Sequence, residues 1–231
     1  MIISKMHWLF KERFNRGSTN FYPDFTPVQI DQFINDAVDI LIQKHSARED
    51  KQLFFDMLNP LLVTDTITSK EPNFFLLSDL KHPYFYNKRI IANTTDCGAI
   101  KVIIEGHGRL NDILNDAFQK PSNKWRRVIG VFENNGVRVY SESPVQSLTI
   151  SYYKYPNQVF FGGYDTLEYL DCNKTSNNCS QYYSKTSTPQ DCEINPTYHA
   201  RVVDVAVQEA QRTLGQENIS LTVNKVDSII N

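Results

Sequence analysis

The clearest pattern of apolar positions lies between residues 26 and 44. Thr26 is followed by Pro27 and Gln29, the arrangement of a capping box with proline at the first helical position. Phe25 and Ile30 flank this start as a hydrophobic staple. Apolar residues then recur at helical spacing, at Ile30, Phe33, Ile34, Ala37, Val38 and Leu41. The pattern predicts a helix from Thr26 to about Lys44.

Three further segments have helical features. Residues 1–16 combine apolar anchors with a basic face, and residues 48–58 predict a shorter helix. Near the end of the sequence, Asn195 and Pro196 form a helix start, and we expect this helix to reach Leu214. Its apolar stripe is His199, Val202, Val203, Ala206, Ala210, Thr213 and Leu214. A histidine in the first turn of such a stripe is usually a packing residue.

Between residues 59 and 156 the apolar period changes to one typical of strands. Short apolar runs predict strands at 62–67, 74–77, 84–91, 100–105, 126–132, 137–140 and 148–153. One inserted helix is expected at 109–118, with Phe118 on its apolar side. Asn134-Asn135-Gly136 separates two of the runs and predicts a hairpin.

This order of elements predicts an α+β protein. We expect the terminal helices, in residues 1–58 and 196–231, to pack as a helical bundle. Residues 59–156 should form a mostly antiparallel β-rich lobe that carries helix 109–118. Residues 157–195 are rich in polar residues and tyrosine and predict an extended polar loop, which at this length is usually functional or disordered.

Composition narrows the class of protein. The 231 residues are 41% hydrophobic and 22% charged, with a net charge of -2, which is ordinary for a globular protein and gives no global attraction to nucleic acid or membrane. No apolar run approaches the ~18 residues of a spanning helix, so no membrane contact is expected. The first ten residues do not resemble a secretory signal, and we expect synthesis in a cytoplasm, where disulfides are rare.

Three cysteines and a histidine are the candidate metal ligands. They follow one another as Cys172, Cys179, Cys192 and His199. Four such ligands suit tetrahedral zinc, but structural zinc sites use a tighter Cys-x2-4-Cys pair than any found here. Free or partly buried cysteines are therefore the expected state, and we expect no metal and no cofactor.

No catalytic motif is present either. The sequence lacks a phosphate-binding loop, a dinucleotide fingerprint and a zinc-protease motif. Glu105 and His107 invite an acid/base interpretation, but the glycines around His107 indicate a turn from strand to helix. We expect a protein without enzymatic activity.

Two surfaces are candidates for interactions. A basic run around Trp125 is a candidate for contact with DNA phosphates, although a solvated strand edge would have the same composition; its members are Lys120, Lys124, Arg126 and Arg127. An aromatic group is a candidate protein interface, although core positions at a sheet end explain it as well; its members are Tyr153, Tyr155, Phe160, Phe161 and Tyr164.

Several short segments of the sequence, taken in order, resemble those of a known family. They are Asn-Arg-Gly-Ser-Thr-Asn-Phe-Tyr-Pro-Asp-Phe-Thr-Pro-Val-Gln-Ile-Asp (15–31), Leu-Asn-Asp-Ile-Leu-Asn-Asp-Ala-Phe-Gln-Lys-Pro (110–121), the hairpin at 134–136, Ile-Ser-Tyr-Tyr-Lys-Tyr-Pro (150–156) and the helix that starts at Asn195-Pro196. Across residues 15–214 the succession resembles the neck ring proteins, or head-to-tail connectors (adaptors), of crAss-like tailed phages. It is more distantly similar to the tail tubular proteins of short-tailed phages.

This resemblance implies a structural virion protein. Such proteins form a ring in the neck that connects the portal to the tail and extends the DNA channel. The implied partners are further copies of the chain, in a twelve-fold ring, the portal protein, neighbouring neck or tail proteins, and DNA in transient passage. The implied location is the neck or tail region of a virion, after synthesis in a bacterial host cytoplasm. The loop 157–195 is longer than the connection expected from this family.

Two alternatives come from other classes of function. One is a tail-associated hydrolase that uses the Cys/His set as a metal site. The other is a binding module that never enters the particle.

Overall fold

The structure is a computed structural model, and it describes residues 1–16, 25–47, 51–69, 71–162, 165–169, 182–186 and 188–214. The chain divides into two compact units, Met1–Pro60 with Pro156–Asn231, and Leu61–Tyr155. We call the first the helical unit and the second the sheet unit. The predicted α+β class is confirmed, since the described residues contain five α-helices and a seven-stranded sheet.

The helical unit contains α1 (Ile3–Arg16), α2 (Pro27–Ser46), α3 (Gln52–Leu58) and α5 (His199–Thr213). The start of α2 has the hydrogen bonds of a capping box: the Thr26 side chain accepts from the Gln29 backbone, and the Gln29 side chain accepts from the Thr26 N–H at 2.9 Å. The α5 segment opens with a 3-10 turn over Pro196–Tyr198, in which the Asn195 side chain accepts from the Thr197 N–H at 3.1 Å.

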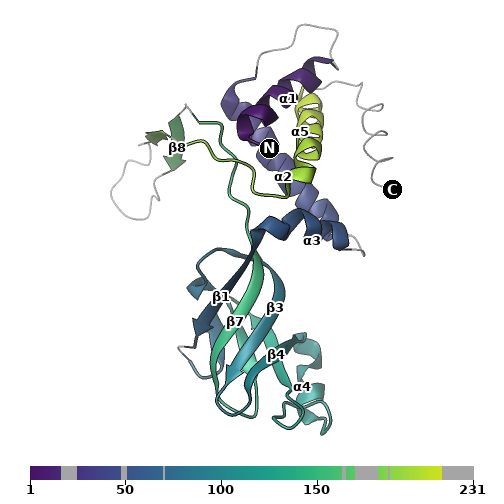
Figure 1. The fold of residues 1–231 in the computed structure, drawn as a ribbon, viewed down its shortest axis with the longest axis vertical. Coiled ribbons are helices and arrows are strands. Elements are labelled where there is room, and N and C mark those ends of the chain that lie inside the picture. The colour runs from purple at the N-terminus through teal and green to yellow at the C-terminus, as the bar shows by residue number, and fades with distance from the viewer. Residues whose placement is uncertain are drawn as a thin grey trace. The chain divides into compact units, whose positions relative to one another are not determined.

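Helices α1, α2 and α5 lie side by side (Figure 1) and bury their apolar faces. Four phenylalanine rings gather where α1 meets the start of α2: Phe10, Phe14, Phe25 and Phe33. The Phe25 ring lies edge-on to that of Phe14, with centroids 5.0 Å apart. Phe25, which precedes the cap of α2, therefore packs the start of that helix against α1.

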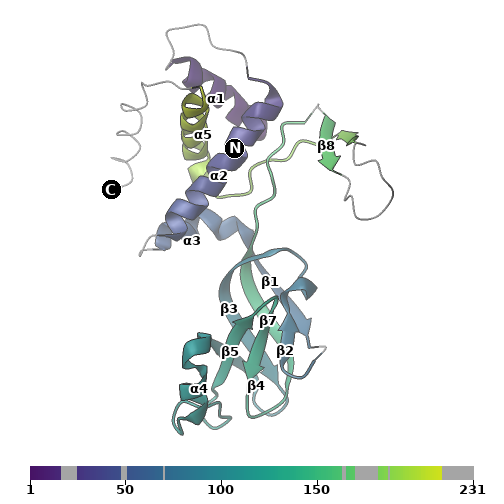
Figure 2. The ribbon, with the colours of Figure 1, turned by 180° about the vertical axis from the view of Figure 1, so that it is seen from behind.

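The sheet unit contains β1 (Leu62–Thr68), β2 (Phe74–Leu76), β3 (Tyr84–Thr94), β4 (Gly98–Ile104), β5 (Val128–Glu133), β6 (Gly136–Tyr140) and β7 (Val145–Lys154). Their order across the sheet is β1-β7-β3-β4-β5-β6-β2. Only the β4–β5 pair is parallel among the pairs described in this sheet. Parallel neighbours need a crossover connection, and α4 (His107–Asn115) lies in that connection beside the sheet (Figure 2).

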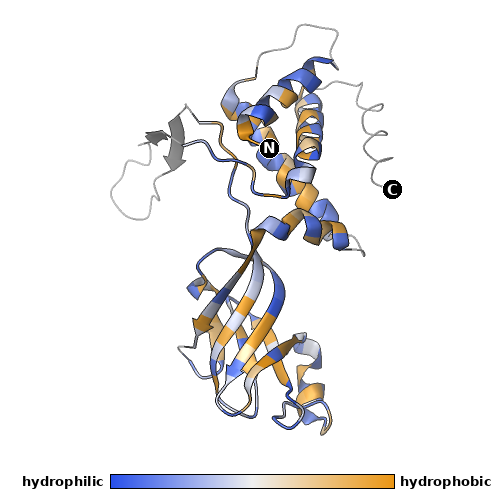
Figure 3. Cartoon of the chain, in the orientation of Figure 1, coloured by the Kyte–Doolittle hydropathy of each residue, from blue (hydrophilic) through white to orange (hydrophobic). Residues whose placement is uncertain are grey.

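The sheet curls because its two edge strands, β1 and β2, are consecutive in the chain. Residues 69–73 alone connect them, which limits the distance between the edges to about 20 Å. Apolar and polar residues alternate along the strands (Figure 3), as one buried face requires. The core inside the curl includes Phe75, Val137, Leu148, Ile150 and Tyr152, each less than 1% exposed.

Three segments differ from the sequence expectations. Helix α4 ends at Asn115 instead of Phe118. The hairpin loop is Asn134-Asn135, and Gly136 already belongs to β6, opposite Glu133. Within the expected extended loop 157–195, the strands β8 (Asp165–Tyr169) and β9 (Tyr182–Thr186) form an antiparallel pair. No helix in the described part of the chain is long and apolar enough to cross a membrane.

Candidate functional site

Of the candidate metal ligands, the structure describes Cys192 and His199. Cys172 and Cys179 lie outside the described residues. His199 is 1% exposed; its Nδ1 lies 2.7 Å from the Met1 nitrogen and its Nε2 2.9 Å from the carbonyl oxygen of Ile194. Burial lowers the pKa of His199 and raises that of Cys192. Among the described residues, no group of three potential ligands could hold a metal ion.

Sequence reasoning missed a buried pair, His7 and Asp31. The His7 Nε2 lies 2.6 Å from Asp31 Oδ1, and the two residues are 6% and 3% exposed. The Phe161 N–H donates to Asp31 Oδ2 at 2.8 Å, and the Phe161 ring stacks on His7 with centroids 4.5 Å apart. Because both carboxylate oxygens have partners, the arrangement ties α1, α2 and residue 161 together.

The aromatic residues considered as an interface have different environments. Tyr153 is 2% exposed and so offers almost no surface. Phe160 pairs through its backbone with Gln190, and Tyr164 lies outside the described residues. Tyr155 is 53% exposed, and its ring lies 4.7 Å from that of Phe85. Of this group, Tyr155 has the largest described exposure.

The basic run lies on a turn that many hydrogen bonds hold in place. Ser122 and Arg127 exchange both backbone hydrogen bonds, at 3.0 and 2.9 Å, and close a tight loop. Arg126 has a φ of 49°, a left-handed conformation that is uncommon for a residue with a side chain. The Asn123 side chain donates to Ser143 Oγ at 2.6 Å, and its N–H donates to Glu142 at 2.7 Å. We call residues 116–127 the 116–127 turn.

The 116–127 turn presents two large aromatic side chains to solvent. Phe118 is 87% exposed and Trp125 is 71% exposed. The Lys124 ammonium lies 5.4 Å from the centroid of the Trp125 ring, within the range of a cation–π contact. The expectation that Phe118 lies on the apolar side of a helix is wrong, because α4 ends before this residue.

Two of the four basic residues of the turn donate hydrogen bonds to backbone carbonyls. Arg127 donates to the carbonyl of Phe118 at 2.7 Å, and Arg126 donates to that of Ala99 at 2.9 Å. These guanidinium groups therefore hold the turn. Lys120 and Lys124 are exposed. Since the acidic residue Glu142 also borders the turn, its charge is mixed. The charges give no single sign to this surface, whereas aromatic side chains are enriched at protein interfaces.

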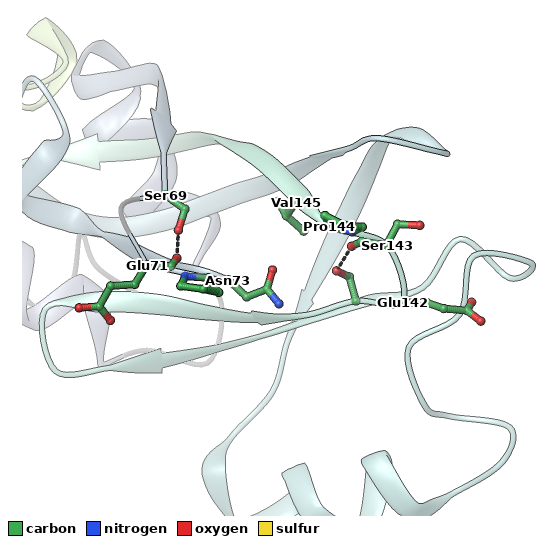
Figure 4. Close-up of a pocket in the computed structure, with 9 residues that line it drawn as sticks. Ser69, Glu71, Asn73, Glu142, Ser143, Pro144 and Val145 are labelled. Carbon is green, nitrogen blue, oxygen red and sulfur yellow. Dashed lines mark hydrogen bonds between the residues drawn. The ribbon is translucent and has the colours of Figure 1, made fainter.

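A polar groove lies next to this turn (Figure 4). Its volume is about 560 Å³, and its lining residues are Ser69, Glu71, Pro72, Asn73, Ser141, Glu142, Ser143, Pro144 and Val145. A smaller cavity of about 290 Å³ shares Pro72, Asn73 and Ser141 and reaches Pro121 of the turn. The carboxylates of Glu71 and Glu142 point away from each other. They are therefore not arranged as an acid/base pair, which would have to converge on one bond.

Glu105 and His107, the other acid/base candidates, are also turned to different partners. His107 Nε2 lies 2.9 Å from the carbonyl oxygen of Phe132, and Glu105 pairs with Arg109 at 3.7 Å. His107 thus fastens the start of α4 to the end of β5, a structural position at the crossover.

Comparison with known proteins adds no family. No protein-family model matches the chain, and no curated protein matches it.

Proposed function

We propose that this chain is a structural virion protein, without enzymatic activity, that forms a ring in the neck of a tailed phage. The observation that carries an assembly role is the exposure of both tryptophans, Trp8 at 61% and Trp125 at 71%, together with Phe118 at 87%. Tryptophan is highly buried on average and is enriched among the residues that dominate binding energy at interfaces. Exposed aromatic side chains of this kind favour a protein whose surface is buried against partners in an assembly.

The internal contacts of the candidate catalytic groups support the same choice. His199, His7 and His107 each hydrogen-bond to other parts of the chain, and the carboxylates of the groove diverge. Each of these histidines therefore has a role in holding the fold. A hydrolase would need groups that converge on a substrate.

The neck location rests on the resemblance of residues 15–214 to neck ring proteins. In this proposal α1, α2 and α5 form the terminal helical bundle and carry the contacts between copies. The 116–127 turn contacts the portal or a neighbouring neck or tail protein through Phe118 and Trp125. Lys120 and Lys124 touch DNA transiently as it passes, while the two arginines hold the turn. A twelve-fold ring would match the portal.

Mass spectrometry of purified particles of the encoding phage, combined with portal co-assembly, tests this function. We expect the chain in particles at the same copy number as the portal protein, and a stable complex when the two are co-expressed. Absence from particles, together with a chain that stays monomeric beside the portal, would contradict the proposal and would favour a module outside the virion. Stoichiometric zinc that is lost in Cys172→Ala and His199→Ala would favour the hydrolase instead.

A further inference from the structure

The outer face of α1 carries a tryptophan among basic residues. Ser4, Trp8, Lys11 and Asn15 follow one another at helical spacing, and all four are exposed. Lys5, three residues before Trp8, is exposed too and has no described ion-pair partner. On the opposite face the helix is well packed, with Met6 and Phe10 fully buried. The outer face of α1 therefore offers an apolar anchor next to a positive charge.

The outer face of α2 has the opposite charge. Asp36 and Asp39 lie three residues apart on this face, both exposed, with no described cation beside them. The pKa of Asp39 is raised, first by partial burial and then by the negative charge of Asp36. The two carboxylates therefore repel each other in the single chain. Val28, which is 48% exposed, adds an apolar side chain to the same helix.

No described contact joins Lys5 or Trp8 to the Asp36–Asp39 face within one copy. Helices α1 and α2 join through their buried sides, where His7 contacts Asp31. Asp39 also borders residues 156–159 and Glu193 of the same unit, whereas Asp36 is exposed. A contact between two different faces of identical subunits is heterologous, and heterologous contacts close into rings when the rotation allows it. Charge complementarity fixes which faces meet and in what register.

We infer that copies of this chain associate by docking the Lys5–Trp8 face of α1 on one copy against the Asp36–Asp39 face of α2 on the next. Trp8 is the apolar anchor of this contact, and Lys5 offsets one of the two negative charges of the acidic pair. The occupant of each face is thus a second copy of the same chain. The inference rests on the proposed ring, for which it supplies the contact between subunits.

Two charge-reversed variants test this contact: Lys5→Glu, and the double variant Asp36→Lys with Asp39→Lys. Sedimentation velocity of the full chain should show oligomers for the wild type. Each variant alone should dissociate at least about tenfold more readily, because like charges then face each other. Lys5 lies in the first turn of α1, where glutamate suits the helix dipole, so folding is preserved.

Mixing the two variants gives the sharper result. In the mixture each α1 face finds an α2 face of opposite charge only on the other variant, so alternating copies should restore the oligomer. Lys101→Glu, an exposed charge reversal in β4, is the matched control and should leave association unchanged. Trp8→Ala should weaken association in every pairing. Restored association should also weaken with rising salt.

Three results would overturn the inference: a wild type that stays monomeric at its highest soluble concentration, single variants that associate like the wild type, or a mixture that does not recover. The result also separates this contact from the proposed function. If particles contain the chain while the variants still associate normally, the proposed contact is contradicted and the proposed function stands. If the chain is absent from particles, yet the mixed variants recover their association, the proposed function is contradicted and the proposed contact stands.

Discussion

The two tryptophans lie on surfaces that are built in different ways. Trp8 projects from the regular helix α1, and its exposure follows from a stripe of exposed positions at helical spacing. Trp125 projects from the 116–127 turn, which is held by side chains of the β6–β7 connection and by a backbone carbonyl of β4. A helix face depends on the packing of its opposite side, whereas the turn depends on individual hydrogen bonds. Substitutions should therefore affect the two surfaces differently.

The largest expected effect is on the packing behind the Trp8 surface. Asp31→Ala leaves His7 and the Phe161 N–H without their buried partner. Breaking a buried pair in this way should lower the free energy of unfolding of the helical unit by about 3 kcal/mol. Chemical denaturation followed by circular dichroism measures it. Asp36→Ala, an exposed change on the same helix, should change this free energy by less than about 0.5 kcal/mol in either direction; a loss equal to that of Asp31→Ala would show that the pair does not support α1.

The second-largest expected effect on stability is in the sheet unit. An alanine at Gly136 would place Cβ 2.5 Å from the Phe74 ring and 2.7 Å from the carbonyl oxygen of Phe75. Overpacking of this kind should cost about 2 kcal/mol in the free energy of unfolding. Gly108→Ala in α4 has open space around its Cβ and should stabilise the protein by up to about 1 kcal/mol. Thermal unfolding of both variants should therefore give shifts of opposite sign.

The two surfaces can then be compared directly through Trp8→Ala and Trp125→Ala. Both side chains are mostly exposed, so each variant should change the free energy of unfolding by less than about 0.5 kcal/mol. The two variants should weaken different associations. Trp8→Ala should weaken contacts between copies, and Trp125→Ala should weaken binding to the portal or a neighbouring neck protein. Sedimentation and a pull-down with portal measure the two properties. Loss of both properties in one variant would mean that the surfaces are not independent.

The smallest effect concerns pH. Because the pKa of Asp39 is raised in the folded chain, its ionised form lowers stability at neutral pH, and this penalty disappears as the pH falls through the raised pKa. Asp39→Asn should therefore raise the melting temperature of the single chain slightly at pH 7, with no gain at low pH. The same variant should associate less. A gain in stability that persists unchanged at low pH would contradict the assigned cause.

The sequence predicts local features of this fold better than distant contacts. The capping residues of α2 are local, and the expected start of that helix is correct. The hairpin at 134–136 is predicted at the correct place. The sequence pattern does not reveal that glycine is needed at 136 because the Phe74 ring approaches the backbone there. The parallel β4–β5 pair depends on how α4 crosses the sheet, which periodicity does not reveal.

For the candidate surfaces too, the sequence predicts local features better than contacts between distant residues. The basic run of the 116–127 turn was visible in the sequence, but the commitment of Arg126 and Arg127 to backbone carbonyls was not. The pair His7–Asp31 joins residues 24 positions apart on two helices, and no local spacing marks it. The exposure of Phe118 depended on where α4 ends, a boundary that an apolar pattern places poorly.

A cryo-EM reconstruction of the portal-proximal neck of the encoding phage is the most direct test of the central claim that this chain is a neck ring protein. We predict density for the chain in a closed ring below the portal, with α1 of each copy against α2 of the next and Trp8 buried between them. A neck in which no density fits this chain would contradict the claim.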